Sequence, residues 1–196
     1  MKSILETDSE IINLILQGDR QIFRILVEKY QSMVFRTCMG FLHNKEDAED
    51  LTQDVFIQAY QSLQGFKGEA AFSTWIYRIA VNASLNKVRK SSRNPILQRF
   101  DTLFGAGKDK EFSFPVSEAE NPESILIRQE HRDWLQVALD SLPDNQRTAI
   151  VLSKYDDLPQ KEIAGIMNTS EGAVEALIQR AKKNLRIKLS SPRGKK

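Results

Sequence analysis

The sequence predicts an all-α protein made of two small helical domains. Apolar residues recur at three- and four-residue spacing along most of the chain, and strand-like alternation is nowhere sustained. Of the 196 residues, 41% are hydrophobic, 28% are charged and only 9 are Gly, a composition typical of a globular chain rich in helix formers. The pattern breaks after residue 90, where Pro, Gly and Ser gather and phenylalanines follow no period. We therefore expect domains at 8–92 and 122–189, a flexible linker at 93–121 and a disordered basic tail at 190–196.

Four helices are expected in the first domain, each with apolar side chains on one face. Their ranges are Ser9 to Gln17, Arg20 to Phe41, Asn44 to Leu63 and Phe72 to Lys90. Gly40 to Asn44 is expected to form the turn into the third helix, and the glycine-containing stretch 65–70 a loop before the fourth. The one cysteine, Cys38, lies in an apolar helical pattern, so a buried thiol is expected rather than a metal or redox site.

The third helix carries two different faces, and the rest of the chain is organised around it. Asn44 is placed to cap its N-terminus, and acidic residues fill its first turns, where the helix dipole favours negative charge. The apolar face consists of Ala48, Leu51, Val55 and Ala59, widened by Phe56, Tyr60 and Leu63. Glu46, Asp50 and Asp54 form an acidic stripe that cannot lie in a core. This stripe either is simply solvated or binds a basic partner.

The fourth helix separates an apolar face from a basic one. Its buried face is expected to contain Phe72, Ile76, Ile79 and Ala83, and its polar face Arg78, Asn82, Asn86 and Arg89. No Asp or Glu occurs between residues 70 and 100, although the net charge of the whole chain is only +2. Arginines and amides without nearby acids suit the phosphates and base edges of a nucleic acid.

The second domain is expected to end in a helix-turn-helix. Asn121-Pro122-Glu123 begins a helix that reaches about Asp140, and Leu142-Pro143 begins another. Residues 160–164 start the first helix of the motif. Ala164 is small enough for a close helix crossing, Asn168 tolerates the left-handed backbone of the turn, and Thr169 or Ser170 caps the second helix. Val174 and Leu177 are expected to pack this second helix onto the first.

The second helix of that motif has an outward face suited to DNA. Its outward residues, expected in the major groove, are Ser170, Glu171, Glu175, Ala176, Gln179 and Arg180. Lys182, Lys183 and Arg186 follow and are expected at phosphates. From residue 178 to the end the chain carries eight Lys or Arg and no acidic residue. Two separate basic zones and one acidic helix together suggest a polyanion and a basic protein as partners.

Several stretches resemble one protein family, in the same order and over roughly residues 8–188. The sequence D-L-T-Q-D-V-F at 50–56 resembles the D-L-x-Q-(D/E)-V-F signature of bacterial RNA polymerase sigma factors. Residues 66–82 resemble the segment of these factors that reads the −10 promoter element. Pro143 and Arg147 match a pattern ahead of the last helix pair, and 170–181 resembles the −35 reading helix. The resemblance is to the extracytoplasmic-function group of the sigma-70 family.

The resemblance implies three functional surfaces. The clamp coiled coil of core RNA polymerase would be bound by Asp50, Leu51, Gln53, Asp54, Val55 and Phe56. Flipped bases and phosphates of −10 DNA would be held by Phe66, Lys67, Gly68, Ser73, Thr74, Tyr77, Arg78, Asn82, Asn86 and Arg89, with Asn82 matching a base-reading asparagine. The −35 element would be read within 160–179 and just beyond, by Ser170, Glu171, Gly172, Glu175, Ala176, Gln179, Arg180 and Lys183.

The resemblance also implies partners and a place of action. Besides the clamp, the polymerase flap and promoter DNA would be bound, and an anti-sigma factor would hold the protein inactive. No nucleophile–base pair, metal-spaced cluster or phosphate-binding glycine loop is found, so no enzyme, cofactor, metal or small-molecule substrate is expected. No apolar run is long enough to insert into a membrane and no signal peptide is recognisable, so a cytoplasmic protein is expected.

Two other functions are compatible with parts of the sequence. A DNA-binding regulator could use only the helix-turn-helix, and a helical adaptor could bind proteins without binding DNA. The signature at 50–56 argues against the first, and the acid-free stretch 70–100 argues against the second. Many relatives have basic or hydroxyl side chains where this chain has Glu175, Ala176 and Leu177, which leaves the −35 bases open.

Overall fold

The computed structural model describes residues 7–93 and 133–190, and within these ranges all regular structure is helical. The elements of the N-terminal part are α1 (Asp8–Leu16), the 3-10 turn η1 (Arg20–Ile22), α2 (Phe23–Leu42), α3 (Lys45–Ser62), the 3-10 turn η2 (Leu63–Gly65) and α4 (Phe72–Arg93). The C-terminal part contains a helical segment at 133–140, α7 (Asp144–Lys154), α8 (Gln160–Met167) and α9 (Glu171–Ser190). The all-α prediction is confirmed. The predicted linker, most of the helix predicted from Asn121, and nearly all of the basic tail lie outside the described residues.

Local sequence signals explain where the N-terminal helices begin and end. The Asn44 side chain accepts a hydrogen bond of 3.0 Å from the backbone N–H of Asp47 and caps α3, as predicted. The turn before α3 is shorter than expected, because α2 continues to Leu42 and ends at His43, which adopts a left-handed conformation with φ 55°. Gly40 is therefore a helical residue. Its role is a close packing contact rather than a turn.

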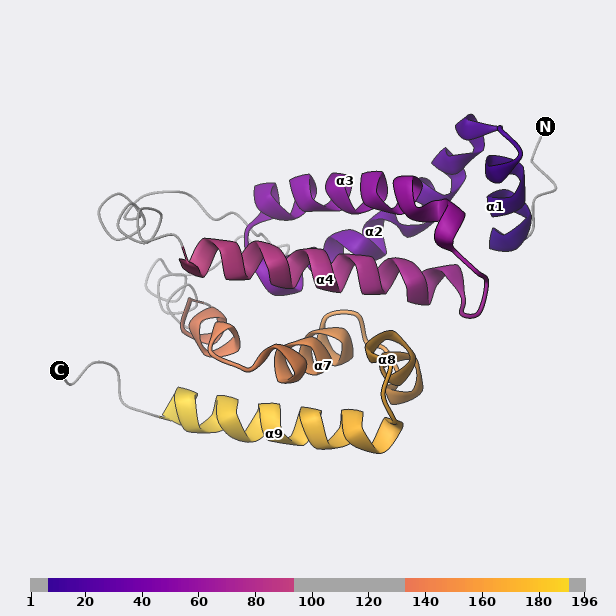
Figure 1. Ribbon diagram of the computed structural model, residues 1–196. Coiled ribbons are helices and arrows are strands. Elements are labelled where there is room, and N and C mark those ends of the chain that lie inside the picture. Colours follow the sequence, from indigo (N-terminus) through magenta and orange to yellow (C-terminus); the bar gives the residue numbers. More distant parts are fainter. Residues whose placement is uncertain (1–6, 94–132, 191–196) are drawn as a thin grey trace, which may run out of the picture.

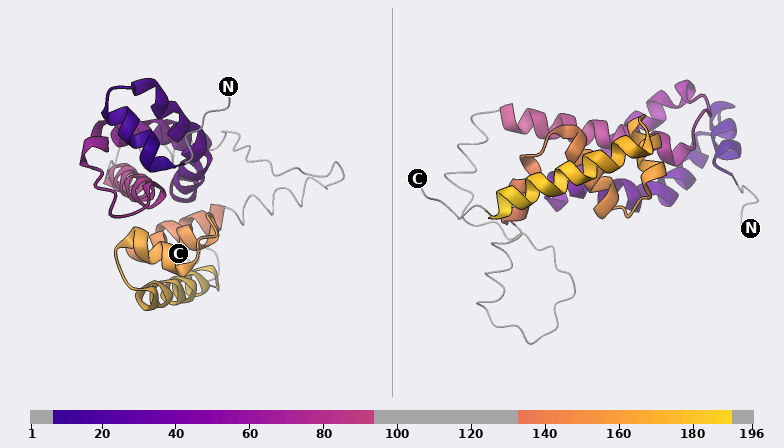
Figure 2. Two further views of the ribbon diagram at one scale, coloured as in Figure 1. Left: turned by 90° about the vertical axis from the view of Figure 1, so that its right-hand side faces the viewer. Right: turned by 90° about the horizontal axis from the view of Figure 1, so that it is seen from below.

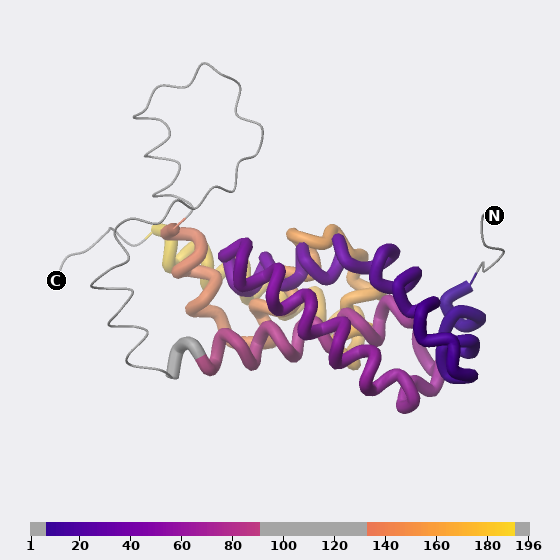
Figure 3. Tube along the Cα trace, turned by 90° about the horizontal axis from the view of Figure 1, so that it is seen from above, coloured from indigo at the N-terminus to yellow at the C-terminus, as the bar shows by residue number. Residues whose placement is uncertain are grey.

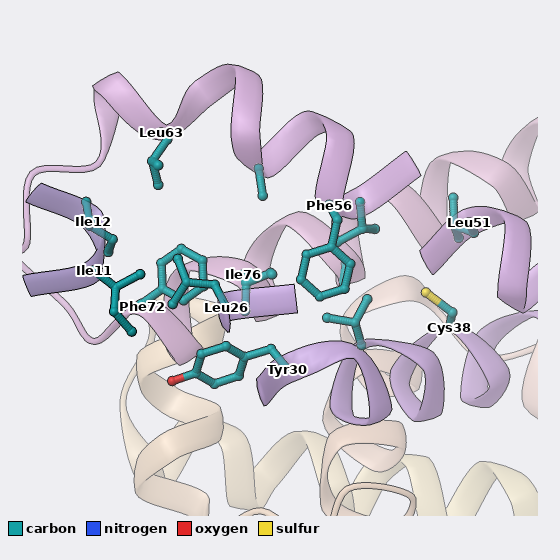
Figure 4. Packing of buried hydrophobic residues seen from close by; sticks show 14 of the residues in the cluster. Ile11, Ile12, Leu26, Tyr30, Cys38, Leu51, Phe56, Leu63, Phe72 and Ile76 are labelled. Atoms are coloured by element: carbon teal, nitrogen blue, oxygen red, sulfur yellow. The ribbon is translucent and has the colours of Figure 1, made fainter. Parts of the chain in front are cut away.

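The N-terminal core lies between α2, α3 and α4, with α1 closing one end. Figure 4 shows Leu26 and Tyr30 of α2 beside Phe72 and Ile76 of α4, with Phe56 of α3 next to them. The rings of Tyr30 and Phe72 are 5.4 Å apart between centroids. Cys38 is completely buried in this core, as predicted, and burial raises the pKa of its thiol.

The C-terminal part forms the predicted helix-turn-helix. Asn168 takes the left-handed conformation with φ 52° between α8 and α9, as its side chain type predicted. Ser170 caps α9 by accepting a hydrogen bond of 3.2 Å from the backbone N–H of Ala173. Ile163 and Val174 are completely buried where the two helices cross, and Ala164 is nearly so. Pro143 immediately precedes α7, again as predicted.

The two parts of the chain are packed against each other. Figure 1 shows α4 in the middle, with α3 on one side of it and α7 and α8 on the other. The end-on view in Figure 2 shows the N-terminal helices as one layer and the C-terminal helices as a second layer beneath them. In Figure 3, α1 lies at the end of the molecule farthest from the 133–140 segment. α9 lies on the outside of the C-terminal layer, on the side away from α4 (Figure 1).

Candidate polymerase and nucleic-acid interfaces

The acidic face of α3 is exposed along its length. Glu46, Asp50 and Asp54 are all exposed, together with Gln53, so the stripe is available to a partner. The other three members of the predicted docking set belong to the core instead. Leu51, Val55 and Phe56 are 5%, 0% and 6% exposed, because they lie on the face of α3 that packs against α2. These apolar residues hold the helix in place, and the acidic and amide side chains form its outer surface.

An apolar residue on the same outer face escaped the sequence reasoning. Ile57 is 56% exposed, one turn after Gln53 and Asp54. A groove lined by Gln31, Ser32, Phe35, Glu49, Thr52 and Gln53 runs beside this face, between α2 and α3. The helical period places Ile57 near the acidic stripe, so its exposure could have been read from the sequence. The outer face thus combines negative charge with one exposed apolar side chain.

The loop before α4 holds an aromatic cluster. The ring of Phe66 lies 5.9 Å from that of Phe72 and 5.3 Å from that of Trp75, between centroids. Phe66 is therefore packed against the N-terminal core, whereas Lys67 and Gly68 are exposed at the tip of the loop. Gly68 has φ 72°, a conformation that costs glycine little, so the loop can turn sharply there. Ser73 and Thr74, in the first turn of α4, are half-buried.

The polar face of α4 is divided between solvent and the C-terminal part. Asn82 and Asn86 are exposed. Tyr77, by contrast, is 5% exposed and packs into the core of the C-terminal helices. Arg78 donates hydrogen bonds to the backbone carbonyls of Gly165 (2.6 Å) and Ile166 (3.2 Å) near the end of α8.

The far end of α4 makes a second contact with the C-terminal part. Arg89 Nε donates to Asp144 Oδ2 at 3.1 Å, and the pair also meets through Nη2. A cavity lies along the same boundary. Its lining residues are Arg78, Val81, Asn82 and Leu85 from α4, with Asn145, Thr148, Ile166, Met167 and Asn168 from the opposite side. The predicted −10 residues thus lie on α4 and on the loop before it, and Tyr77, Arg78 and Arg89 face protein in this arrangement.

The outer face of α9 is open. The predicted −35 residues Ser170, Glu171, Gly172, Glu175, Gln179, Arg180 and Lys183 are all exposed, and Ala176 is half-buried. Arg180 Nε donates to the carbonyl of Ala176 at 3.1 Å, which holds the guanidinium along the helix. Leu177 is half-buried against the C-terminal core. The exposed residues of this set lie together on the outward surface of α9.

Two buried ionisable groups lie at the boundary between the two parts, and sequence reasoning missed one of them, Asp156. The carboxylate of Asp156, in the loop after α7, accepts a 2.9 Å hydrogen bond from Thr37 of α2. Arg36 Nε is 3.6 Å from its other oxygen, which allows an ion pair but is too long for a hydrogen bond. Burial raises the pKa of Asp156 to about 6 despite these contacts. Burial also raises the pKa of the Tyr77 hydroxyl.

The described ranges 7–93 and 133–190 contain neither a metal-binding cluster nor a helix suited to cross a membrane. No three His, Cys, Asp or Glu side chains there are grouped so that they could hold a metal ion. No helix in those ranges is both long enough and apolar enough to cross a membrane.

Comparison with known proteins identifies both parts of the chain. Residues 26–94 match the family model Sigma-70 region 2, and residues 132–185 match Sigma-70, region 4. The chain is 34% identical over 176 residues to the ECF RNA polymerase sigma-E factor of Escherichia coli, covering 90% of this chain and 91% of the relative. It is 32% identical over 177 residues to the RNA polymerase sigma-H factor of Pseudomonas aeruginosa, with the same coverage of both chains.

Solved structures show the same fold. CnrH in complex with the cytosolic domain of CnrY matches with a TM-score of 0.61 at 22% identity, over 94% of this chain and 97% of that one. The sigma factor RpoE in complex with the anti-sigma factor NepR from Bartonella quintana matches with a TM-score of 0.55 at 19% identity, over 87% and 98%. Fold, order of regions and sequence identity agree along the chain. The protein belongs to the extracytoplasmic-function group of the sigma-70 family, whose members direct RNA polymerase to promoters.

Proposed function

We propose that this alternative sigma factor binds core RNA polymerase through the outer face of α3 and selects promoters with α4 and α9. Sigma factors regulate transcription rather than catalyse a reaction, and the proposed site of action is the cytoplasm, where polymerase and chromosome meet. The observation that carries the proposal is that one chain combines an exposed acidic face on α3 with a helix-turn-helix whose second helix, α9, has an exposed outer face.

Core polymerase is bound, in this proposal, by Asp50, Gln53 and Asp54 with Ile57 beside them. These side chains are exposed. The carboxylates can pair with a basic surface, and Ile57 can contact the aliphatic parts of the Lys and Arg side chains of that surface. Leu51, Val55 and Phe56 act indirectly, because their burial fixes the rotation of α3 and so aims the acidic face outward. The clamp coiled coil is the proposed partner of this face, and the flap the proposed partner of the C-terminal domain.

Promoter DNA is read at two places. Asn82 is proposed to hydrogen-bond the pairing edge of a flipped −10 base, with Lys67 and Arg78 at neighbouring phosphates. The exposed face of α9 is proposed to enter the major groove at the −35 element, where Gln179 and Arg180 offer donors to base edges. Glu175 can accept from cytosine N4, so a cytosine at the matching position is favoured.

An anti-sigma factor is the proposed inhibitor. RpoE of Bartonella quintana is bound to the anti-sigma factor NepR in its matched structure, and CnrH is bound to the cytosolic domain of CnrY in the other. The surfaces available for one here are the exposed faces of α3 and α9.

Transcription in vitro tests the proposal. Purified chain is mixed with bacterial core polymerase and a library of templates with random −35 and −10 segments. The expected result is initiation from a narrow subset of templates that share two elements, with none when core is supplied alone. A chain that binds DNA without core polymerase, and that never directs the polymerase to a promoter, would instead be a regulator that uses only the helix-turn-helix. Salt-dependent binding to a promoter only in the presence of core polymerase distinguishes the proposed factor from an adaptor that does not bind DNA.

A further inference from the structure

The loop that the proposed function places at the −10 element has little support of its own. This −10 loop, residues 66–71, joins η2 to α4 and contains no helical or strand residue. Lys67 and Gly68 at its tip are exposed. A segment of this kind changes conformation readily unless neighbouring side chains hold it. A loop that already has its bound shape before DNA arrives binds more tightly, because it loses less freedom on binding.

The ring of Phe66 attaches the start of the −10 loop to the aromatic cluster of the N-terminal core. It lies 5.9 Å from the ring of Phe72 and 5.3 Å from that of Trp75, between centroids. The rings of Phe72 and Trp75 are 5.5 Å apart. Phe72 is 2% exposed, whereas Phe66 and Trp75 are half-buried. The position of the loop therefore depends on the side chains that hold Phe72 from the interior.

Tyr30 of α2 packs against Phe72 on that interior side and is itself hydrogen-bonded to α1. The centroids of the two rings are 5.4 Å apart. The Tyr30 hydroxyl donates to Asp8 Oδ2 at 2.5 Å, and Lys29 Nζ donates to Asp8 Oδ1 at 2.6 Å. Burial, and then the Asp8 carboxylate, raises the pKa of this hydroxyl, so it keeps its proton and acts as the donor. The Lys29 side chain is 50% exposed, so the bond from Tyr30 is the better shielded of the two contacts.

α1 covers the same aromatic cluster from the end of the molecule. Ile11 and Ile12 are 3% and 4% exposed, and Figure 4 shows both on the side of the core that carries Leu63 and Phe72. α1 also packs against η2, the turn that leads into the −10 loop. With nine residues it is too short to be a stable helix by itself. Its attachment therefore depends on its isoleucines and on the contacts of Asp8.

We propose that α1 positions the −10 loop, and that the hydrogen bond between Tyr30 and Asp8 holds α1 in place for this purpose. The proposal rests on the assignment of the loop to −10 DNA in the proposed function. With the bond made, Tyr30 and α1 together support Phe72, and Phe72 supports Phe66 at the start of the loop. When the bond is lost, α1 loosens and the loop spends less time in the shape that receives a base. Asp8 and Tyr30 are positioning residues, because they act on DNA only through the loop.

Substitutions at the two ends of this hydrogen bond test the proposal. Tyr30→Phe removes the hydroxyl but keeps the ring that packs on Phe72. Tyr60→Phe is the matched control, because its ring packs on Phe23, 5.0 Å away between centroids, at a different place in the same core. Asp8→Ala and Asp8→Asn both remove the charge, but only Asn keeps an oxygen that can accept from Tyr30. If the two residues act through one bond, the double variant Asp8→Ala/Tyr30→Phe is no more impaired than either single variant.

Two kinds of measurement on the full chain are made for each variant. The free chain is followed by the fluorescence of Trp75 in a background that carries Trp134→Phe, which leaves one of the two Trp residues of the sequence. Quenching by acrylamide reports access to the indole ring on which Phe66 packs. With core polymerase, the affinity of the labelled variant for core is measured by anisotropy. The rate of initiation is then measured on a template that the wild type selects.

In Tyr30→Phe and Asp8→Ala, Trp75 should become easier to quench and initiation should decrease by about three- to tenfold, the change expected from one hydrogen bond. Affinity for core should stay the same, because the outer face of α3 takes no part in these contacts. Asp8→Asn and Tyr60→Phe should match the wild type in all three measurements. The double variant should match the single variants.

The positioning role is overturned if quenching or initiation is unaltered in Tyr30→Phe and Asp8→Ala. It is also overturned if Asp8→Asn is as impaired as Asp8→Ala, or if Tyr60→Phe shows the same loss. An equal loss of affinity for core would mean general destabilisation and would overturn it too. Failure of the proposed function would appear instead as absence of promoter-specific initiation by the wild type with core, whatever the quenching of the free chain shows.

Discussion

At the scale of single residues, exposure decides which side chains of α3 can meet a partner. Asp50 and Asp54 are exposed, while Leu51 and Val55, each the next residue along the chain, are buried. A helix shows a partner only every third or fourth residue, so a contiguous signature in the sequence mixes contact residues with residues that position them. The two groups should respond differently to substitution.

Charge reversal at Asp50 tests the contact group. Asp50→Arg is expected to weaken binding to core polymerase at least tenfold, because it replaces attraction to a basic surface with repulsion. The melting temperature should stay within about 2 °C of the wild type, since the side chain is exposed. Binding is measured by anisotropy with labelled protein. Glu162→Arg, a reversal at an exposed acid of α8, is the control, and an equal loss there would assign the effect to net charge.

A second residue-scale prediction concerns the base reader. Asn82→Ala should remove about 1–3 kcal/mol of discrimination at one −10 position, because an amide that pairs with a base edge is lost. The measurement is transcription in vitro from templates carrying each of the four bases at every −10 position. Asn86→Ala, one turn along the same exposed face, is the comparison. An unaltered base preference in the Asn82 variant would remove this residue from the reading site.

At the scale of elements, the residue types at the ends of helices predicted two of the observed caps and turns. Asn44 begins α3 and Asn168 joins α8 to α9, and both predictions depended only on what asparagine does at helix ends. The turn after α2 was misplaced because Gly40 reads as a helix terminator. The sequence contains no sign that its missing side chain is needed for contact with Val151, more than a hundred residues away. The faces of the helices were predicted from the periodicity of apolar residues. This periodicity shows which side chains are buried, but it does not show which other helix covers them.

The α3 cap gives an element-scale prediction. Asn44→Ala should lower the free energy of unfolding by about 1 kcal/mol, because the backbone N–H of Asp47 loses its acceptor. Asn44→Asp should retain most of the stability, since a carboxylate caps equally well and suits the helix dipole. Urea unfolding followed by circular dichroism at 222 nm gives both values. Equal stability of the Ala and Asp variants would mean that the cap contributes nothing to α3.

At the scale of the whole molecule, the sequence predicted both domains but not their contact. Arg78 and Arg89 were expected at phosphates, and Tyr77 beside a base pocket, because a basic and aromatic helix without acids suits nucleic acid. The observed hydrogen-bond partners of the two arginines lie 55 to 88 residues farther along the chain. Pairing across such a distance depends on packing shape, which local patterns do not encode. The same side chains can serve both contacts only if the domains move apart.

Protonation of Asp156 should shift the balance between closed and open forms. Its pKa is about 6 when closed and should return toward the ordinary 3.8 once the domains part. The closed form therefore binds the proton more tightly, so closure is favoured as pH falls through 6 and is weakest above it. The groups facing this carboxylate are Arg36 and Thr37 of α2 and Tyr77 of α4, with Asp157 beside it.

Double electron–electron resonance between spin labels at Gln61→Cys and Lys188→Cys, exposed positions on α3 and α9, tests this dependence. Between pH 7.5 and pH 5, the open fraction is expected to decrease in the wild type by a free energy of about 1.4 kcal/mol, because this range covers only the part of the titration above pH 5. Asp156→Asn carries a neutral side chain of the same shape, so it should stay closed across this range and lose most of the pH response. A pH response of the same size in Asp156→Asn would show that the buried carboxylate does not cause the effect.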